Sequence, residues 1–99
     1  MRIIARKALR ECWERPECRN AEGPLKAWFR EVERAEWTSP ADVKAAFRNA
    51  SIVGNGRVVF NIAGNKYRLV AKVNYPYRIP YVRFVGTHRA YDQIDVNEV

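Results

Sequence analysis

Apolar and polar residues alternate with a period of two in three consecutive segments of the chain, residues 58–62, 66–75 and 79–86. This alternation is typical of strands that have one buried and one exposed face. The segments are separated only by "AGN" and "PYR", and such short connections join antiparallel neighbours rather than parallel ones. The second half of the chain therefore predicts a three-stranded antiparallel meander.

The first half of the chain follows the helical period instead. A first apolar face, with the spacing i, i+3, i+4, i+7 and i+8, joins Ala5, Ala8, Leu9, Cys12 and Trp13. Pro16 then disfavours continuation of that helix. The pattern returns with Leu25, Trp28, Phe29 and Val32. These patterns predict two amphipathic helices, each with one side turned towards a core.

A third, shorter helix is predicted in "TSPADVKAAF", residues 38–47. Ser39 can cap this helix with its hydroxyl, and Pro40 suits the first helical position. Asp42 lies in the first turn, beside the positive end of the helix dipole. This stretch therefore carries a complete signal for the start of a helix.

Together these segments predict an α+β fold. A small antiparallel sheet, made of the meander and a short N-terminal strand over Arg2–Ala5, packs against two to three N-terminal helices. The stretch "NASIVGNGR", residues 49–57, predicts the loop between the helices and the sheet. A chain of 99 residues supports one core, so we predict a single domain over residues 1–99.

The charge of the chain, +7 in total, is unevenly distributed. Residues 1–42 hold nine Lys or Arg and eight Asp or Glu, whereas residues 43–91 contain no acidic residue at all. The basic residues of this second segment are Lys44, Arg48, Arg57, Lys66, Arg68, Lys72, Arg78, Arg83 and Arg89. A positive segment of this length predicts an electrostatic footprint for phosphates; solubility alone is the alternative explanation.

Alternation also sorts the strand side chains between the two faces of the sheet. The apolar face, which includes Val82 and Phe84 of the last strand, is predicted to lie under the helices. The opposite face, which also takes Val85, bears Asn61, Arg68, Lys72, Tyr81 and Arg83. Such a face is suited to hold an RNA strand, although it is also what a solvated sheet surface looks like. The absence of acidic residues favours phosphate contact, since surface sheets usually mix charges across strands.

The segment "THRAYD" contains the only histidine of the chain, His88. A helical turn here would bring His88 and Tyr91 to one side, just past the strand that carries Arg83. The histidine side chain titrates near neutral pH, so it can serve as a proton donor or acceptor. Thr87 or His88 could instead begin a local turn with a purely structural role, and spacing alone leaves both interpretations open.

Several classes of catalytic site are missing from the sequence. It has no glycine-rich phosphate loop followed by Lys, no HExxH and no GxSxG. Its last half holds only three carboxylates, Asp92, Asp95 and Glu98, which are too few for a two-metal nuclease. Any nuclease chemistry is therefore predicted to need no metal or cofactor, with cations stabilising the developing charge and the RNA's own 2′-OH as nucleophile.

Cys12 and Cys18 stand six residues apart with no histidine nearby, a spacing typical of neither zinc fingers nor disulfide frameworks. Both are predicted to be reduced thiols of a cytoplasmic protein, with Cys12 on the core face of its helix. The start "MRIIARKALRE" becomes charged too early for a signal peptide, and no apolar run approaches transmembrane length. No membrane partner is therefore predicted.

Two long runs, "RVVFNIAGNKYRLVAKVNY" and "VRFVGTHRAYDQID", resemble the HigB-type toxins of bacterial type II toxin–antitoxin modules, a branch of the RelE-like mRNA interferases. The resemblance is close over residues 57–95 and looser over residues 1–50, where Trp28 and "ADVKAAF" stand in matching places. It implies a RelE-like fold and cleavage of translated mRNA in the ribosomal A site. It also implies inhibition by a HigA-type helix-turn-helix antitoxin, with operator DNA bound only through the toxin–antitoxin complex.

The resemblance also assigns functional positions, which are Asn61, Arg68, Lys72, His88, Tyr91 and Asp92. We predict that Arg68 and Lys72, with Arg83 as a further candidate, hold the scissile phosphate and that His88 exchanges protons with the 2′-OH or the 5′-leaving oxygen. Tyr91 is predicted to orient the nucleotide, with Asp92 in a supporting role. The residues predicted to bind RNA around this centre are Arg57, Asn61, Lys66, Tyr81, Arg83 and Arg89.

Three interpretations of the activity stay open at this point. In the first, the chain cuts RNA on the ribosome and leaves a 2′,3′-cyclic phosphate. In the second, the same basic sheet grips mRNA or rRNA without cutting it, and in the third the chain is an inactive toxin that persists as an antitoxin partner. Trp37, which follows the second predicted helix, is a candidate for contact with the antitoxin.

Overall fold

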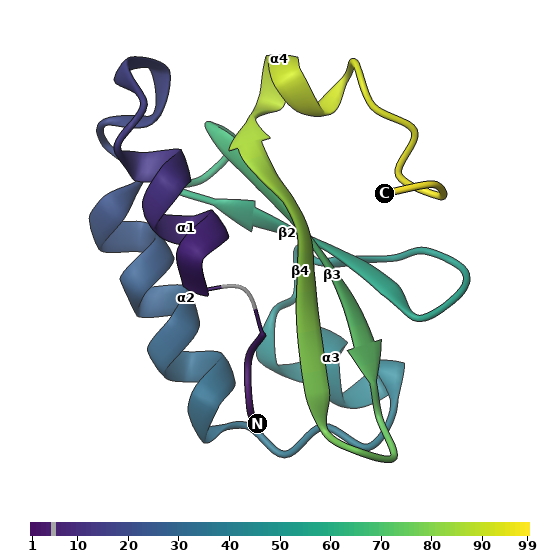
Figure 1. Ribbon diagram of the computed structural model, residues 1–99. Coiled ribbons are helices and arrows are strands. Elements are labelled where there is room, and N and C mark those ends of the chain that lie inside the picture. The colour runs from purple at the N-terminus through teal and green to yellow at the C-terminus, as the bar shows by residue number, and fades with distance from the viewer. Residues whose placement is uncertain (5) are drawn as a thin grey trace.

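The computed structural model describes residues 1–4 and 6–99. Its helical elements are α1 (Arg6–Trp13), the short 3-10 helix η1 (Pro16–Cys18), α2 (Glu22–Arg34), α3 (Pro40–Ala46) and α4 (His88–Tyr91). Its strands are β1 (Ser51–Ile52), β2 (Arg57–Ile62), β3 (Tyr67–Asn74) and β4 (Ile79–Thr87). Figure 1 shows α1 and α2 side by side along one flank of the sheet, with α4 following the end of β4. The predicted α+β fold is confirmed.

The sheet has four strands in the order β1-β2-β3-β4, and all neighbouring strands are antiparallel. The predicted meander corresponds to β2, β3 and β4. The prediction of a plain loop over residues 49–57 is wrong, because Ser51 and Ile52 pair with Val59 and Val58. This segment contains "VGNG", in which Asn55 and Gly56 take positive φ angles, and this tight turn folds the chain back as a short hairpin onto β2.

The predicted N-terminal strand is reduced to a single bridge. Ile4 pairs in parallel with Tyr81, and its backbone accepts a hydrogen bond from Val82 and donates one to Pro80. Ala5, which belonged to both the predicted strand and the first predicted helical face, lies outside the described residues. The leading segment therefore borders the open edge of β4 without forming a regular strand.

The main core lies between the helices and one face of the sheet. Its largest fully buried side chains include Leu9 of α1, Leu25 and Val32 of α2, and Phe60 and Leu69 of the sheet. The Phe60 ring packs edge-on against Trp28 at 5.4 Å between ring centroids and against Phe47 at 5.1 Å. Aromatic rings from helices and strands thus close the core on the side predicted by the alternation.

The start of α3 is built differently from the prediction. Ser39 is the N-cap residue and Pro40 the first helical residue, as predicted, but the Ser39 side chain makes no capping hydrogen bond. The Asp42 carboxylate instead accepts hydrogen bonds from the backbone N–H and the hydroxyl of Thr38. These two bonds lower the pKa of Asp42, since they favour the ionised carboxylate.

Cys12 and Cys18 are both buried and both free thiols, as predicted. Burial, together with a hydrogen bond to Cys18, raises the pKa of Cys12 to about 12. Within the described part of the chain, no helix is both long and apolar enough to span a bilayer.

Candidate functional site

The strand register arranges the side chains that face away from the helices, here called the outer face, in three rows across the sheet. The row nearest α4 consists of Asn61, Arg68 and Gly86. The middle row, called the apolar row, consists of Val59, Val70 and Phe84. The third row consists of Arg57, Lys72 and Tyr81. An apolar row therefore separates Arg68 from Lys72.

A β-bulge in β4 places Phe84 in the apolar row. The register between β3 and β4 shifts at Val70/Ala71, so that Arg83 has no partner between Val82 and Phe84. The extra residue reverses the alternation after it: Phe84 lies on the outer face and Val85 is buried in the main core. The predicted faces of Phe84 and Val85 were therefore wrong, whereas Tyr81 and Val82, before the bulge, lie as predicted.

Arg68 and Tyr91 come together above the end of the sheet nearest α4. The Arg68 guanidinium lies 6.0 Å from the centroid of the Tyr91 ring, and that ring packs against Phe84 with centroids 6.3 Å apart. A Cβ atom on Gly86 would meet the Phe84 ring at 3.1 Å and the Cβ of Ala90 at 3.6 Å. The bare glycine opposite Arg68 thus leaves room for Phe84 and α4 to support Tyr91.

The turn of "THRAYD" is a helix with a side-chain cap, since the Thr87 hydroxyl accepts a hydrogen bond from the backbone N–H of Ala90. The backbone N–H of His88 donates to the carbonyl of Lys66, which ties α4 to the β2–β3 turn. The His88 Nδ1 lies 3.3 Å from an Asp92 oxygen, one helical turn further on. His88 therefore pairs with Asp92, and both side chains are exposed.

Lys72, Tyr81 and Arg83 line one open hollow at the other end of the outer face. The hollow measures about 380 Å³, and its remaining walls are Val73, Asn74, Tyr75 and Pro76 at the β3–β4 hairpin. Lys72 and Tyr81 are directly paired across the two strands, and Arg83 reaches the hollow from the bulge. Three residues that the sequence predicted as RNA contacts thus meet in one place.

The segment after α4 lies over part of the outer face. Arg57 donates two hydrogen bonds, of 3.1 and 2.8 Å, to the backbone oxygen of Val99. Val59 and Val70 point away from the helices, yet they are only 4% and 0% exposed. The apolar row is therefore shielded from solvent, and Arg57 is engaged with the chain's own C-terminal segment.

The other predicted residues lie around the ends of the strands. Asn61 donates a hydrogen bond of 3.3 Å to the carbonyl of Asn49, at the edge of the sheet next to α3. Lys66 and Arg89 are exposed, Lys66 in the β2–β3 turn and Arg89 in α4. Both belong to the end of the outer face that carries Arg68 and Tyr91, because the Lys66 carbonyl binds the start of α4.

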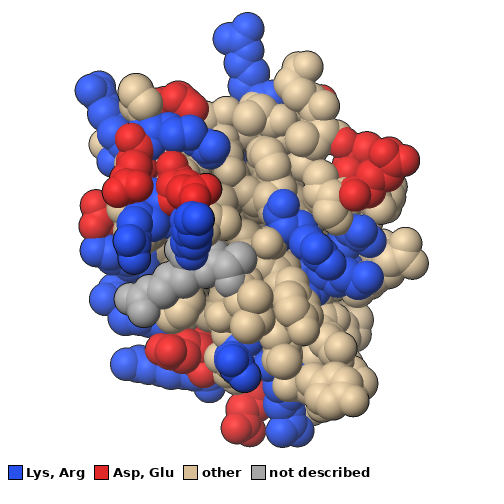
Figure 2. Space-filling view, in the orientation of Figure 1, with Lys and Arg blue, Asp and Glu red and all other residues tan. Residues whose placement is uncertain are grey.

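Arg68, Lys72 and Arg83 of the outer face have no Asp or Glu partner among the described residues. The ion pairs of the described residues are Lys7–Glu11, Arg15–Glu17, Lys26–Glu22 and His88–Asp92. Figure 2 shows the same contrast: basic and acidic side chains alternate over α1 and α2, whereas Lys and Arg gather without acidic neighbours between them beside β4. This arrangement leaves the positive charges of Arg68, Lys72 and Arg83 available to an anionic ligand.

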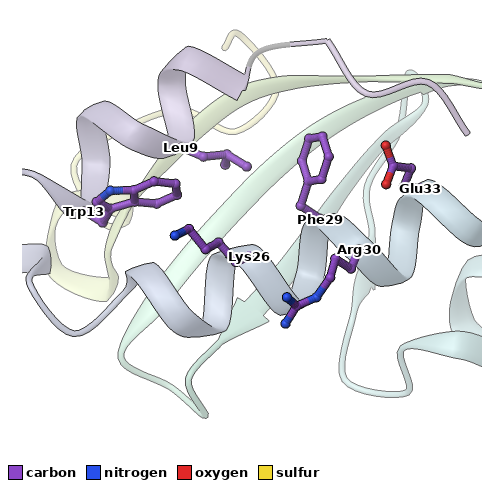
Figure 3. A pocket seen from close by; sticks show the side chains of 6 residues that line it. All are labelled: Leu9, Trp13, Lys26, Phe29, Arg30 and Glu33. Atoms are coloured by element: carbon purple, nitrogen blue, oxygen red, sulfur yellow. The ribbon is translucent and has the colours of Figure 1, made fainter.

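Another hollow lies away from these cations, between α1 and α2 (Figure 3). It measures about 280 Å³ and is lined by Leu9, Trp13, Lys26, Phe29, Arg30 and Glu33. The Lys26 ammonium lies 5.4 Å from the centre of the Trp13 ring. The predicted role of Trp37 in a partner surface is wrong, because Trp37 is only 4% exposed and stacks on Phe60.

The model of a known protein family matches residues 21–94, and that family is described as HigB_toxin, the RelE-like toxic component of a toxin–antitoxin system. The chain belongs to the HigB toxin family. Its RelE-like fold agrees with the predicted resemblance, and the matched segment contains α2, α3, the whole sheet and α4. All the predicted site residues lie within this segment.

Similar proteins carry the HigB name in several bacteria. The mRNA interferase toxin HigB of Escherichia coli (strain K12) is 31% identical over 94 residues, which cover 93% of this chain and 88% of that protein. The mRNA interferase HigB of Shigella flexneri matches to the same extent. The mRNA interferase HigB of Escherichia coli O6:H1 (strain CFT073) is 24% identical over 96 residues, covering 95% of this chain and 91% of that protein.

Sequence reasoning missed two residues of the candidate site, Phe84 and Gly86. Phe84 was assigned to the core because alternation was extended through the bulge. The contact of Phe84 with Tyr91 and the position of Gly86 opposite Arg68 follow only from the pairing between strands. A glycine inside a predicted strand was the available signal, since it often marks close approach of another group.

Proposed function

We propose that the chain is an endoribonuclease of the mRNA interferase type, which cuts mRNA in the ribosomal A site during translation, in the bacterial cytoplasm. A HigA-type helix-turn-helix antitoxin restrains it, and operator DNA is contacted only through the toxin–antitoxin complex. The names of its HigB relatives support this proposal. The observation that carries it is the outer face, on which Arg68, Lys72 and Arg83 lack carboxylate partners among the described residues.

The proposed reaction is an attack of the RNA's own 2′-oxygen on the neighbouring phosphorus, without a metal ion. The bond from phosphorus to the 5′-oxygen breaks, the 2′-OH loses its proton and the leaving 5′-oxygen gains one. Negative charge accumulates on the phosphate oxygens in the transition state. Arg68 would stabilise that charge through its planar fork of N–H donors, oriented by the ring of Tyr91 beneath it.

His88 would exchange the protons. Because Asp92 takes the Nδ1 side of the imidazole, the Nε2 side is free to face the substrate, in the same way that a carboxylate orients a catalytic histidine elsewhere. Both side chains are exposed, so substrate can reach them from solvent. Lys66 and Arg89 lie at this end and would contact neighbouring phosphates, whereas Asn61 would support the edge of the site.

Mapping of RNA ends in cells that briefly express the chain tests the proposal. New 5′ ends inside translated frames are expected for the wild type, and Arg68→Ala is expected to abolish them. His88→Ala should lower the cleavage rate by about 10²- to 10⁴-fold, the usual contribution of a proton-transfer group. Arg30→Ala, which removes one positive charge from the α1–α2 hollow, is the matched control and should cut like the wild type.

The chemistry of the ends tests the mechanism separately. Attack by the 2′-oxygen leaves a 2′,3′-cyclic phosphate or, after opening, a terminal phosphate on the upstream fragment. These fragments should join a 3′ adaptor only after treatment with a 3′-phosphatase. Fragments that join the adaptor directly would carry a 3′-hydroxyl, which indicates attack by water, and would contradict the proposed mechanism while leaving nuclease activity intact.

A second candidate function is a non-cleaving grip on mRNA or rRNA. It is favoured by the position of His88, whose exposed side chain pairs with Asp92, while Tyr91 lies beside the Arg68 guanidinium. In that case translation would stop with the message uncut. His88→Ala would then leave the arrest unchanged, while Arg68→Ala would relieve it.

A further inference from the structure

We propose that the hollow at the β3–β4 hairpin is a nucleotide subsite separate from the cleavage centre, where Lys72 and Arg83 hold a phosphate and Tyr81 stacks on a base. The proposal rests on the proposed function, because it concerns the same RNA strand. It moves Lys72 from the cleavage centre, its predicted place, to a site that grips RNA beyond the scissile bond.

The geometry of the outer face separates the two sites. Arg68 and Lys72 are four residues apart on β3, which corresponds to roughly 13 Å along an extended strand. The apolar row lies between them, with Val70 fully buried. Arg68 is held at one end by the Tyr91 ring. The two cations thus stand in separate rows, and an RNA strand that meets each of them at its own row must extend over more than one nucleotide.

The hollow has the size and chemistry of a nucleotide site. Its volume of about 380 Å³ falls within the usual range of small-ligand pockets. Two of its side chains, Lys72 and Arg83, are cations without a carboxylate partner in the described part of the chain. Tyr81 adds an aromatic ring, and stacking on such a ring accepts any base.

The other polar groups near the hollow are either bonded within the fold or shielded from solvent. The Asn74 side-chain oxygen accepts a hydrogen bond from the backbone N–H of Tyr77 in the hairpin turn. Tyr75 packs against the main core, and its hydroxyl is buried without a hydrogen-bond partner among the described residues, so it is shielded from a ligand in the open hollow. Arg57, in the same cross-strand row as Lys72 and Tyr81, binds Val99. Lys72, Tyr81 and Arg83 are therefore the side chains of the hollow that can bind RNA. These residue types suit contact with a phosphate and a stacked base rather than hydrogen bonding to base edges.

The bulge at Arg83 explains how the hollow arises. Without the extra residue, regular alternation would leave no room for both Arg83 and Phe84 on the outer face. With it, Arg83 turns towards Lys72 while Phe84 turns towards Tyr91. Bulges commonly redirect side chains next to functional sites, and this one would supply a residue to each subsite.

Single-turnover cleavage of programmed ribosomes, measured over a range of toxin concentrations, separates gripping from cutting. Lys72→Ala and Arg83→Ala should each raise the half-saturating toxin concentration about tenfold or more, with the maximal rate within about twofold of the wild type. Arg68→Ala should instead lower the maximal rate. A fall in the maximal rate of Lys72→Ala, at an unchanged half-saturating concentration, would return Lys72 to the cleavage centre and overturn the proposal.

Tyr81 offers a sharper test, in which anisotropy reports binding of a fluorescent six-nucleotide single-stranded RNA to the His88→Ala protein. Tyr81→Phe keeps the ring and should bind as tightly as the parent, whereas Tyr81→Ala should bind roughly tenfold more weakly. The Lys72→Ala/Arg83→Ala pair should reduce the slope of log affinity against log salt by about 0.7, the value for one phosphate that the protein no longer neutralises. Arg30→Ala, which also removes one positive charge but lies in the α1–α2 hollow, is the control.

This binding assay needs no cleavage, so it separates failure of the inference from failure of the proposed function. If the wild type cuts no RNA but the Tyr81 and Lys72/Arg83 variants lose RNA affinity as expected, the subsite stands and the cleavage mechanism fails. If Tyr81→Ala binds RNA as well as its parent and the double variant keeps the full salt slope, the hollow does not bind RNA and the inference is wrong. Thermal unfolding of each variant checks that the fold is intact.

Discussion

Regular alternation of apolar and polar residues explains the helix-covered face of the sheet better than it explains the outer face. On the face covered by the helices, every inward-facing residue of β2 and β3 is buried, from Val58 to Ile62 and from Tyr67 to Val73. On the outer face, cations, a phenol and an amide are interrupted by an apolar row that is itself shielded. The helix-covered face therefore forms the core, whereas the outer face combines a buried apolar row with the two groups of side chains that we propose bind RNA.

The physical reason is that apolar burial determines the helix-covered face, whereas charges also determine the outer face. Burial of apolar area has no preferred direction, so a repeating pattern suffices to specify the core. Cations without carboxylate partners are costly to bury, so the face that carries them is not closed as a second core. The apolar row separates the two groups, and α4 with the segment after it limits the open area of this face.

Phe60→Ala provides the largest expected effect and tests the helix-covered face. Removal of this ring, which contacts Trp28, Trp37 and Phe47, should lower the free energy of unfolding by about 3–5 kcal/mol. Arg83→Ala on the outer face should change it by less than about 0.5 kcal/mol. Urea unfolding followed by tryptophan fluorescence measures both. Equal losses in the two variants would mean that the faces do not differ in their contribution to stability.

Phe84→Ala tests the residue that the bulge moved between faces. Its ring is half-buried and packs on Tyr91, so its loss should cost about 1–2 kcal/mol of unfolding free energy. Because Tyr91 orients Arg68, the maximal cleavage rate should also fall, by about tenfold or more. Phe84→Leu keeps an apolar contact and is the control. A variant with the full cleavage rate at reduced stability would show that Phe84 serves only packing.

The pH dependence due to Cys12 is the smallest expected effect, and it tests whether the core on the helix-covered face keeps this thiol buried and uncharged. Its ordinary pKa of 9.0 is raised to about 12 by burial and by the hydrogen bond to Cys18. Above pH 9 the unfolded thiol therefore loses its proton while the folded thiol keeps it, so stability falls as the pH rises. Unfolding free energies measured between pH 9 and about 11 should decline more steeply for the wild type than for Cys12→Ala. Parallel declines would contradict the burial of an uncharged thiol.

Regular elements and the identity of the outer face were predictable from local patterns. Period-two alternation located β2 and β3 and predicted that Asn61, Arg68 and Lys72 share one face. Both predictions depend only on neighbouring residues within a regular strand. The helical faces were likewise local, as was Pro40 at the start of α3. The hydrogen bonds from Thr38 to the Asp42 carboxylate at the start of α3 were not predicted, since the sequence equally allowed the Ser39 hydroxyl to cap the helix.

The sequence by itself determined the family, the α+β architecture and the cations of the outer face, because these depend on residue type and on spacing within single segments. Only the tertiary structure decided that Phe84 supports Tyr91, that Arg83 lines a hollow with Lys72, and that Arg68 and Lys72 belong to different rows. Each of these depends on the β-bulge and on pairing between strands. One extra residue in a strand reverses every side chain after it, and alternation along a single strand does not reveal which residue its neighbour leaves unpaired.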